Sequence, residues 1–167
     1  MKVVFVHPSY ESLGIEYLSA CLKKEGIKTK LVFDPRLFDD NIIYSKTLSR
    51  IFSYTEDTVK MVIESKPDLI AVSSVTDDYQ WVKKICKDIK KVKDIPIVVG
   101  GIHPTSAPET VIMNKNIDYI CIGEGENAIV ELAKNIRDKK NTSNIKNIWS
   151  KKGIEIKKNK VMPAIPD

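Results

Sequence analysis

The sequence predicts an α/β domain in which helices cover both faces of a five-stranded parallel sheet. Three observations lead to this prediction: short, β-branched apolar runs recur along the chain, segments of helical period separate them, and two of the runs break abruptly into glycines. Strands buried on both faces carry such continuous apolar runs, whereas half-exposed strands alternate. With right-handed crossovers, the alternation of strand and helix favours a flavodoxin-like (Rossmann-like) strand order, 2-1-3-4-5.

The predicted strands are short and largely apolar, and they lie at residues 2–6, 29–33, 69–73, 95–99 and 119–122. Apolar residues three or four positions apart mark helices at residues 13–22, 57–65, 81–89 and 129–136. Gly26 and Pro67 end the first two of these helices. Residues 36–55 carry no clear period, and we expect a partly helical excursion there.

The composition changes after Asn141. Residues 145–156 are expected to form a β-hairpin whose turn contains Gly153, and residues 162–167 resemble a linker. We therefore divide the chain into an α/β domain of residues 1–140 and a hairpin with linker of residues 141–167. An end in such a linker is typical of a piece of a longer polypeptide.

Composition and charge limit the class of protein. The chain has 167 residues, 43% of them hydrophobic, which suffices for one good core. Its net charge is +5, and many of its lysines lie in residues 83–93 and 151–160. No aromatic residues that could stack on bases alternate with these lysines, so we expect solvent-exposed faces and no binding to nucleic acid. The three cysteines are widely spaced, and we expect them to be reduced thiols. The sequence shows no signal peptide and no apolar run of membrane-spanning length. We therefore expect a soluble, cytoplasmic protein without a membrane partner.

Two glycine-rich breaks mark the expected binding edge. They lie within residues 97–105 and 118–126, after the fourth and fifth predicted strands. Ligands of open parallel sheets bind at the carboxyl ends of strands, and glycine lets a ligand approach the backbone. We expect one broad ligand across both loops, although Glu124 and Glu126 also suit the positive end of a helix without any ligand.

The switch point of the predicted sheet lies between the first and third strands. At this point the hydroxyls of Ser73, Ser74 and Thr76 are available for a polar ligand. The alternative is that one of them, or Asp77, caps the following helix, and the sequence alone favours this alternative.

Several function classes are excluded. A phosphoryl-accepting receiver requires acidic residues directly after the first strand, and residues 6–9 (VHPS) supply none. No flavodoxin-type phosphate loop, Gly-x-x-x-x-Gly-Lys loop or Gly-x-Gly-x-x-Gly motif stands in the right place either. His7 and His103 are too few for a catalytic triad. No cysteine pair has metal-site spacing.

Five motifs in order resemble the cobalamin-binding domain that precedes the radical S-adenosylmethionine domain in class B methylases and related enzymes. They are residues 13–20 (LGIEYLSA), 67–74 (PDLIAVSS), 100–105 (GGIHPT) with Pro108 and Glu109, 118–126 (DYICIGEGE), and the hairpin with Trp149 and Gly153. The resemblance covers almost the whole chain.

The resemblance implies that cobalamin is bound with its corrin ring over the carboxyl edge of the sheet and its nucleotide tail beside the third and fourth strands. It assigns tail hydrogen bonds to Ser73, Ser74 and Thr76, and close backbone approach to Gly100 and Gly101. The other cofactor-binding residues that it implies are Ser9, Tyr10, His103, Thr105, Gly123, Glu124 and Gly125.

One departure concerns the cobalt. Cobalamin mutases and methionine synthase carry Asp-x-His-x-x-Gly after the first strand, and the His of this motif binds cobalt. In this chain Phe5 and Tyr10 stand where His7 would need the Asp and the Gly. A ligating His needs an orienting partner, so we expect no metal ligand from this chain, with His7 as the less favoured alternative. We expect Tyr10 or another loop side chain to cover the lower face of the ring.

The resulting hypothesis is a cobalamin-binding module, the N-terminal part of a cobalamin-dependent radical S-adenosylmethionine enzyme that performs methyl transfer or related radical chemistry. The Cys-x-x-x-Cys-x-x-Cys motif of a 4Fe-4S cluster is not in this chain. We therefore expect catalysis to need a C-terminal radical domain as partner, which would supply that cluster and bind S-adenosylmethionine. Two alternatives remain open: a stand-alone corrinoid carrier, and a ligand-free docking domain of the same fold.

Overall fold

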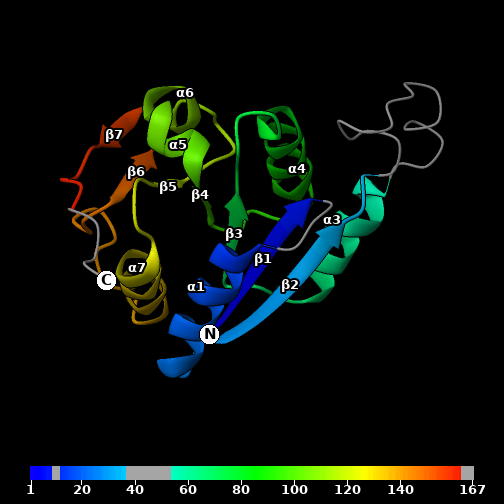
Figure 1. Cartoon of the computed structure of the whole chain (residues 1–167), viewed down its shortest axis with the longest axis horizontal. Coiled ribbons are helices and arrows are strands. Elements are labelled where there is room, and N and C mark those ends of the chain that lie inside the picture. The colour runs from blue at the N-terminus through cyan, green and yellow to red at the C-terminus, as the bar shows by residue number, and fades with distance from the viewer. Residues whose placement is uncertain (9–11, 37–53, 163–167) are drawn as a thin grey trace.

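The computed structural model describes residues 1–8, 12–36 and 54–162. Its centre is a seven-stranded sheet in the order β2-β1-β3-β4-β5-β6-β7 (Figure 1). The first five strands are parallel and confirm the predicted order. They are β1 (Lys2–Pro8), β2 (Lys28–Asp34), β3 (Leu69–Ser73), β4 (Ile97–Gly100) and β5 (Tyr119–Cys121).

The predicted hairpin is present, and it continues the same sheet. β6 (Ile148–Lys152) pairs antiparallel with β5, and β7 (Glu155–Lys157) pairs antiparallel with β6. The sheet therefore has seven strands, two more than the five predicted for the parallel part. Ile148 gives the physical reason, because it lies opposite Cys121 and is buried in the same apolar cluster.

Helices pack on both faces of the sheet. α1 (Leu13–Lys24) and α7 (Glu126–Arg137) lie on one face, and α3 (Thr55–Glu64), α4 (Tyr79–Val92) and α6 (Pro108–Ile112) lie on the other. α5 (Ile102–Ser106) connects β4 to α6. The four predicted helices are confirmed, whereas α5 and α6 were not predicted. Residues 37–53, most of the expected helical excursion, lie outside the described residues.

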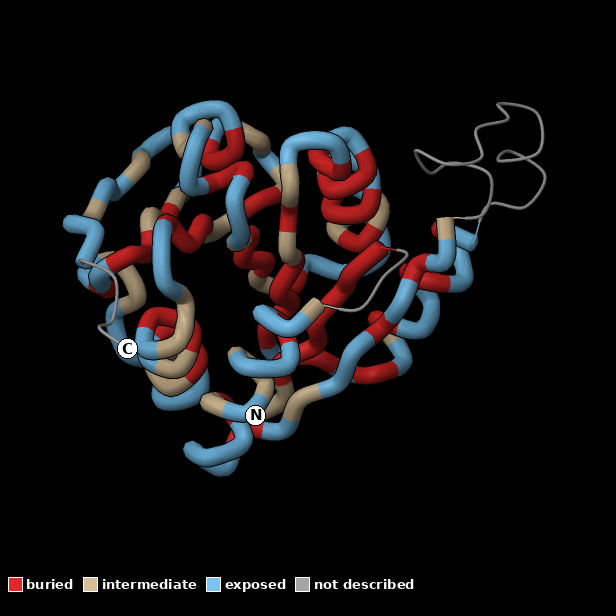
Figure 2. Tube along the Cα trace, in the orientation of Figure 1, coloured by how far each residue is buried: buried red, intermediate tan, exposed pale blue. Residues whose placement is uncertain are grey.

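Alternating side chains of the strands fill two apolar cores. In β1, Val4 and Val6 point into the core under α3 and α4, and Val3 and Phe5 point into the core under α1 and α7. Buried residues accordingly follow the strands and the inner sides of the helices (Figure 2). Within the described ranges, no helix has the length and apolar character needed to cross a membrane.

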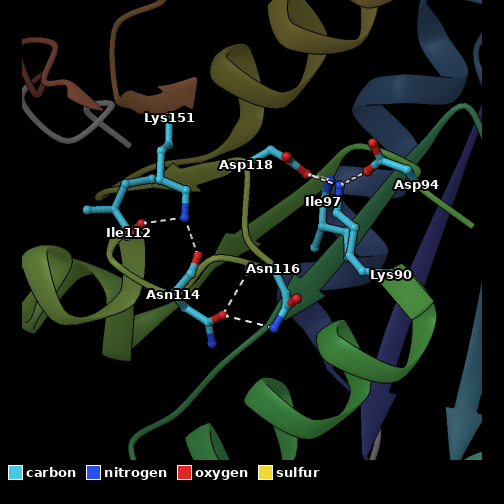
Figure 3. Close-up of polar contacts among 8 residues, drawn as sticks. All are labelled: Lys90, Asp94, Ile97, Ile112, Asn114, Asn116, Asp118 and Lys151. Atoms are coloured by element: carbon cyan, nitrogen blue, oxygen red, sulfur yellow. Dashed lines mark hydrogen bonds and ion pairs between the residues drawn. The ribbon is translucent and has the colours of Figure 1, made fainter. Parts of the chain in front are cut away.

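A polar network ties the hairpin to the amino ends of β4 and β5 (Figure 3). The Asp118 carboxylate accepts a hydrogen bond from the Ile97 backbone N–H at 2.8 Å and pairs with the Lys90 ammonium at 2.9 Å. On β6, the Lys151 ammonium donates to the carbonyl oxygens of Ile112, at 3.0 Å, and Asn114. This network lies at the edge of the sheet opposite the glycine-rich loops, so we assign it a structural role.

Candidate functional site

A cleft of about 190 Å³ lies at the carboxyl ends of β3, β4 and β5, between these strands and helices α1 and α7. Its polar lining comes from Ser73, at the end of β3, and Glu126, at the start of α7. The rest of the lining is mainly apolar side chains and glycine backbone. The main apolar side chains are Phe5, Ile15, Leu18, Val98, Cys121 and Ile129, and the glycines are Gly14, Gly100, Gly101, Gly123 and Gly125.

The glycines at 100 and 125 keep this cleft open. A Cβ added to Gly100 would lie 3.6 Å from the Cβ of Cys121, an ordinary contact distance. A Cβ added to Gly125 would lie 3.3 Å from Cδ2 of Leu18. The fold therefore has little need of glycine at position 100, and only a modest need at position 125. A ligand in the cleft can therefore approach the backbone of Gly100, whereas the Leu18 side chain already lies close to the space beside Gly125.

Gly101 has a different reason to be glycine. Its φ of 103° and ψ of −166° belong to a backbone region that is essentially restricted to glycine. A Cβ at this position would also lie 2.8 Å from the Ser74 carbonyl oxygen. The chain's own loop after β3 thus fills the space beside the Cα of Gly101, while the Gly101 backbone still lines the cleft and its assignment to the cofactor stays a prediction.

The hydroxyls of Ser73, Ser74 and Thr76, at the end of β3 and just after it, have different surroundings. Ser73 lines the cleft, whereas Ser74 is fully buried and its Oγ donates to the Val75 carbonyl at 3.1 Å. Thr76 is exposed, and its Oγ1 lies 3.3 Å from Nδ1 of His103. The alternative of a capping side chain is not observed in the described part of the chain, because α4 begins after Asp78 without a side-chain cap hydrogen bond.

His103 faces α4 and is not among the residues that line the cleft. Its ring packs on the ring of Tyr79 with centroids 4.3 Å apart, and its backbone N–H donates to the Ser74 carbonyl at 3.0 Å. Nε2 of His103 is buried and has no hydrogen-bond partner among the described residues. Its assignment to the cofactor stays a prediction.

Thr105 joins the two glycine-containing loops. Its Oγ1 donates to the Gly101 carbonyl at 2.9 Å and accepts from the Gly123 backbone N–H at 3.0 Å. The loops that follow β4 and β5 are therefore held at a fixed spacing above the cleft. Thr105 itself is exposed and contributes this spacing rather than a wall of the cleft.

Acidic residues gather where α7 begins. Glu124 is exposed, and its backbone carbonyl accepts a hydrogen bond from Nδ2 of Asn147 at 2.8 Å. Glu126 lines the cleft, and its Oε2 is buried without a hydrogen-bond partner among the described residues. Burial, and then the charges of Glu126 and Glu124, raise the pKa of the Cys121 thiol to about 12. This thiol stays protonated and acts as part of the apolar wall.

His7 lies inside β1, opposite Phe33 of β2, and not in the loop after the strand. It is buried, and its ring meets that of Phe33 edge-on with centroids 6.2 Å apart. Burial lowers the pKa of His7, and the Asp78 carboxylate opposes part of this shift. The neutral imidazole is therefore favoured. Ser9 and Tyr10 lie outside the described residues.

Sequence reasoning missed the helix-side wall of the cleft. Leu18 and Ile129 belong to the apolar stripes of α1 and α7, and stripes of this kind ordinarily indicate core contacts. Gly14 was the available signal, because a glycine in the first turn of a helix costs stability unless close approach is needed. A Cβ on Gly14 would meet only Ser12 Oγ, at 3.9 Å, so the fold itself does not demand glycine there.

Comparison with known proteins places this geometry in a family. A model of the B12 binding domain matches residues 3–133, which is most of the chain. The chain belongs to the B12-binding domain family. The anaerobic magnesium-protoporphyrin IX monomethyl ester cyclase of Rubrivivax gelatinosus is 30% identical over 146 residues, which are 79% of this chain and 24% of that protein. This B12-binding domain thus spans about a quarter of the length of the curated relatives that it matches.

Solved structures show the same fold in larger proteins. One is the radical S-adenosylmethionine methyltransferase TsrM from Kitasatospora setae, solved with cobalamin and a 4Fe-4S cluster bound. It superposes with a TM-score of 0.74 at 16% identity, and the match covers 98% of this chain and 30% of TsrM. Another is the cobalamin-dependent S-adenosylmethionine radical enzyme OxsB, solved with aqua-cobalamin and S-adenosylmethionine bound. Its TM-score is 0.75 at 19% identity, and the match covers 98% of this chain and 22% of OxsB. In both proteins the matching part is one portion of a longer chain.

Proposed function

We propose that this chain binds cobalamin at the carboxyl edge of its sheet, with the nucleotide tail in the cleft between the strands and helices α1 and α7. The observation that carries the proposal is the cleft beside the backbone of Gly100, at the edge of the sheet where ligands of parallel sheets bind. Membership of the B12-binding domain family supports the same ligand.

The residues of the cleft fit such a tail. Phe5, Val98 and Ile129 offer apolar surface to an aromatic base, and the Ser73 hydroxyl offers a donor and an acceptor. Glu126 Oε2 is a buried acceptor that a ligand hydroxyl or amide would satisfy. When bound, cobalamin supplies a cobalt centre able to carry a methyl group or exchange electrons. This chain's own residues bind the tail and fix the spacing of the loops.

We further propose that the domain works as a cytoplasmic module of a radical S-adenosylmethionine enzyme, whose C-terminal radical domain performs the reaction with it. The free thiols of the three cysteines support a reducing compartment. The short coverage of relatives and of solved neighbours supports a module of a larger enzyme. In this arrangement residues 1–140 hold the cofactor, and residues 141–167 lead toward the radical domain.

Titration of the purified chain with cobalamin, followed by absorbance, tests the proposal. We expect a bound spectrum in which the dimethylbenzimidazole base is displaced from cobalt, because a base buried in the cleft cannot also ligate the metal. A bound spectrum identical to that of free base-on cobalamin would contradict the placement of the tail. Absence of any binding would favour a ligand-free docking domain.

A further inference from the structure

Asn147 connects the loop at the cleft to the last described segment of the chain. The residue is buried, and its backbone carbonyl accepts from the Ile122 N–H at 2.8 Å. Its side-chain Nδ2 donates to the Glu124 carbonyl at 2.8 Å, and its Oδ1 accepts from the Met162 N–H at 2.7 Å. Its backbone N–H donates to the Lys160 carbonyl at 3.1 Å. One residue therefore makes two hydrogen bonds to each of the two segments.

The backbone of Asn147 is fixed in a conformation that suits this role. Its φ of 63° lies in the left-handed region, which asparagine adopts more readily than most residues. Because Nδ2 and Oδ1 belong to one planar amide, a rotation that follows the Glu124 carbonyl also moves Oδ1 relative to the Met162 N–H. The two side-chain hydrogen bonds are therefore mechanically dependent on each other.

The last described segment, residues 158–162, is hydrogen-bonded to the hairpin before it passes the loop after β5. The Trp149 indole donates to the Asn159 carbonyl at 3.1 Å, and Asn159 Nδ2 donates to the Ile148 carbonyl at 2.7 Å. Beyond this anchor, Cγ1 of Val161 lies 3.4 Å from the position of a Cβ on Gly123. The segment thus runs directly beside the loop that borders the cleft.

We propose that Asn147 is a positioning residue that couples occupancy of the cleft to the position of residues 160–162. The proposal rests on the proposed function in one respect, since it takes cobalamin as the ligand. Coupling of this kind is reciprocal, so the segment also influences binding in the cleft. A change in the position of the loop after β5 would then change the position of residues 160–162, and the reverse, through the side chain of Asn147.

The first arm of the test needs no ligand. Thr105→Val removes the hydrogen bond from the Gly123 N–H to Thr105, and with it the hydrogen bond from Thr105 to the Gly101 carbonyl. We expect this change to raise amide exchange at Met162, measured by NMR, by about threefold to tenfold, the range of one hydrogen bond. In an Asn147→Gly background, Thr105→Val should add nothing at Met162. An unchanged amide exchange rate at Met162 after Thr105→Val would overturn the proposal. An equal rise of this rate in the native and the Asn147→Gly backgrounds would overturn it as well.

Glycine at 147 keeps the left-handed backbone, so Asn147→Gly removes the side chain without adding strain. Lys139→Gly is the matched control, because Lys139 has a φ of 53° at the far end of α7. In this control the response of Met162 to Thr105→Val should persist. If Asn147→Gly fails to fold, the response of Met162 to Thr105→Val in the otherwise native chain still decides whether the loop and the segment are linked.

The second arm uses cobalamin. In the native chain, saturating cobalamin should slow exchange at Met162 by at least about threefold, the lower end of the same range. In Asn147→Gly, cobalamin should still change its spectrum on binding but leave Met162 unaffected. Equal slowing in both proteins would contradict the role of Asn147. If no spectral change occurs in the native chain, the proposed function fails, and the ligand-free arm alone decides the coupling.

Discussion

At Gly101 the chain leaves β4 with a φ of 103°, and the Ser74 carbonyl oxygen lies only 2.8 Å from the position of a Cβ. The neighbouring Gly100 has neither constraint, since a Cβ there would make an ordinary contact with Cys121. The two glycines are neighbours in the sequence, but glycine is needed at the two positions for different reasons. Gly101 serves the fold, and Gly100 serves the free volume of the cleft.

We predict that Gly101→Ala destabilises the native state by about 2 kcal/mol or more, through backbone strain and the contact with Ser74. Gly100→Ala should cost less than about 1 kcal/mol, because its methyl group would make an ordinary contact with Cys121. Urea unfolding followed by circular dichroism measures both. Equal losses of stability in the two variants would show that the distinction is wrong.

His7 makes the stability of the protein depend on pH. Its pKa is lowered in the native state by burial, with partial opposition from Asp78. As pH falls through about 6.5, the unfolded chain takes up a proton that native His7 resists, so the free energy of unfolding decreases. Below the native pKa this loss levels off.

His7→Gln should therefore lose less stability than the native chain between about pH 7.5 and about pH 5.5, on either side of the ordinary pKa of histidine. Urea unfolding at the two pH values checks this, with His103→Gln as the second histidine variant for comparison. The same loss of stability in His7→Gln and in the native chain would assign the effect to other groups.

The sequence predicted a binding site at the loops after β4 and β5 but not the direction of each side chain. A glycine at a strand end is visible in the sequence, and a cleft lies at the predicted edge, where ligand binding stays a prediction. The inward position of Ser74 and the packing of His103 on Tyr79 depend on contacts between β3, α4 and α5. Such contacts leave no periodic signal.

At the scale of elements, β2 and α4 are tied by a buried polar contact. The Trp81 indole N–H donates to the Asp34 carboxylate at 2.8 Å, and Asp34 is only 2% exposed. The backbone N–H of Arg36 donates to the same carboxylate, and the Arg36 guanidinium pairs with Asp78. This contact lies at the carboxyl end of β2, where Asp34 pairs with Pro8 of β1.

We predict that Trp81→Phe lowers the free energy of unfolding by about 1–3 kcal/mol, because it leaves a buried carboxylate oxygen without its donor. Trp149→Phe is the matched control, since this half-buried indole donates to a backbone carbonyl in the hairpin. Its loss should be about 1 kcal/mol or less. A loss in Trp81→Phe no larger than in Trp149→Phe would contradict the importance of the β2–α4 contact.

The elements themselves were predictable where periodicity is long enough to read. α1, α3, α4 and α7 have ten or more residues each and were predicted, whereas α5 and α6 have five residues each and were not. Five residues make little more than one turn, so no apolar period can appear. The hairpin was predicted, but its pairing with β5 depends on the burial of Ile148.

At the scale of the whole molecule, the two edges of the sheet differ in structure. The amino edge is closed by the network of Lys90, Asp118 and Lys151, which fixes the hairpin. The carboxyl edge carries the cleft, with its glycines and the Thr105 contact between loops. The polar contacts that hold the hairpin and the candidate binding cleft therefore lie at opposite edges of the sheet.

The most direct test of the account compares cobalamin with cobinamide, which keeps the corrin ring but lacks the nucleotide tail. Calorimetric titration of the native chain should show at least about tenfold tighter binding of cobalamin, a difference of about 1.4 kcal/mol. Gly100→Val, which fills the cleft beside Cys121, should abolish this preference and leave cobinamide binding unchanged. Equal affinities for the two corrinoids in the native chain, or a preference that survives in Gly100→Val, would contradict a tail seated in the cleft.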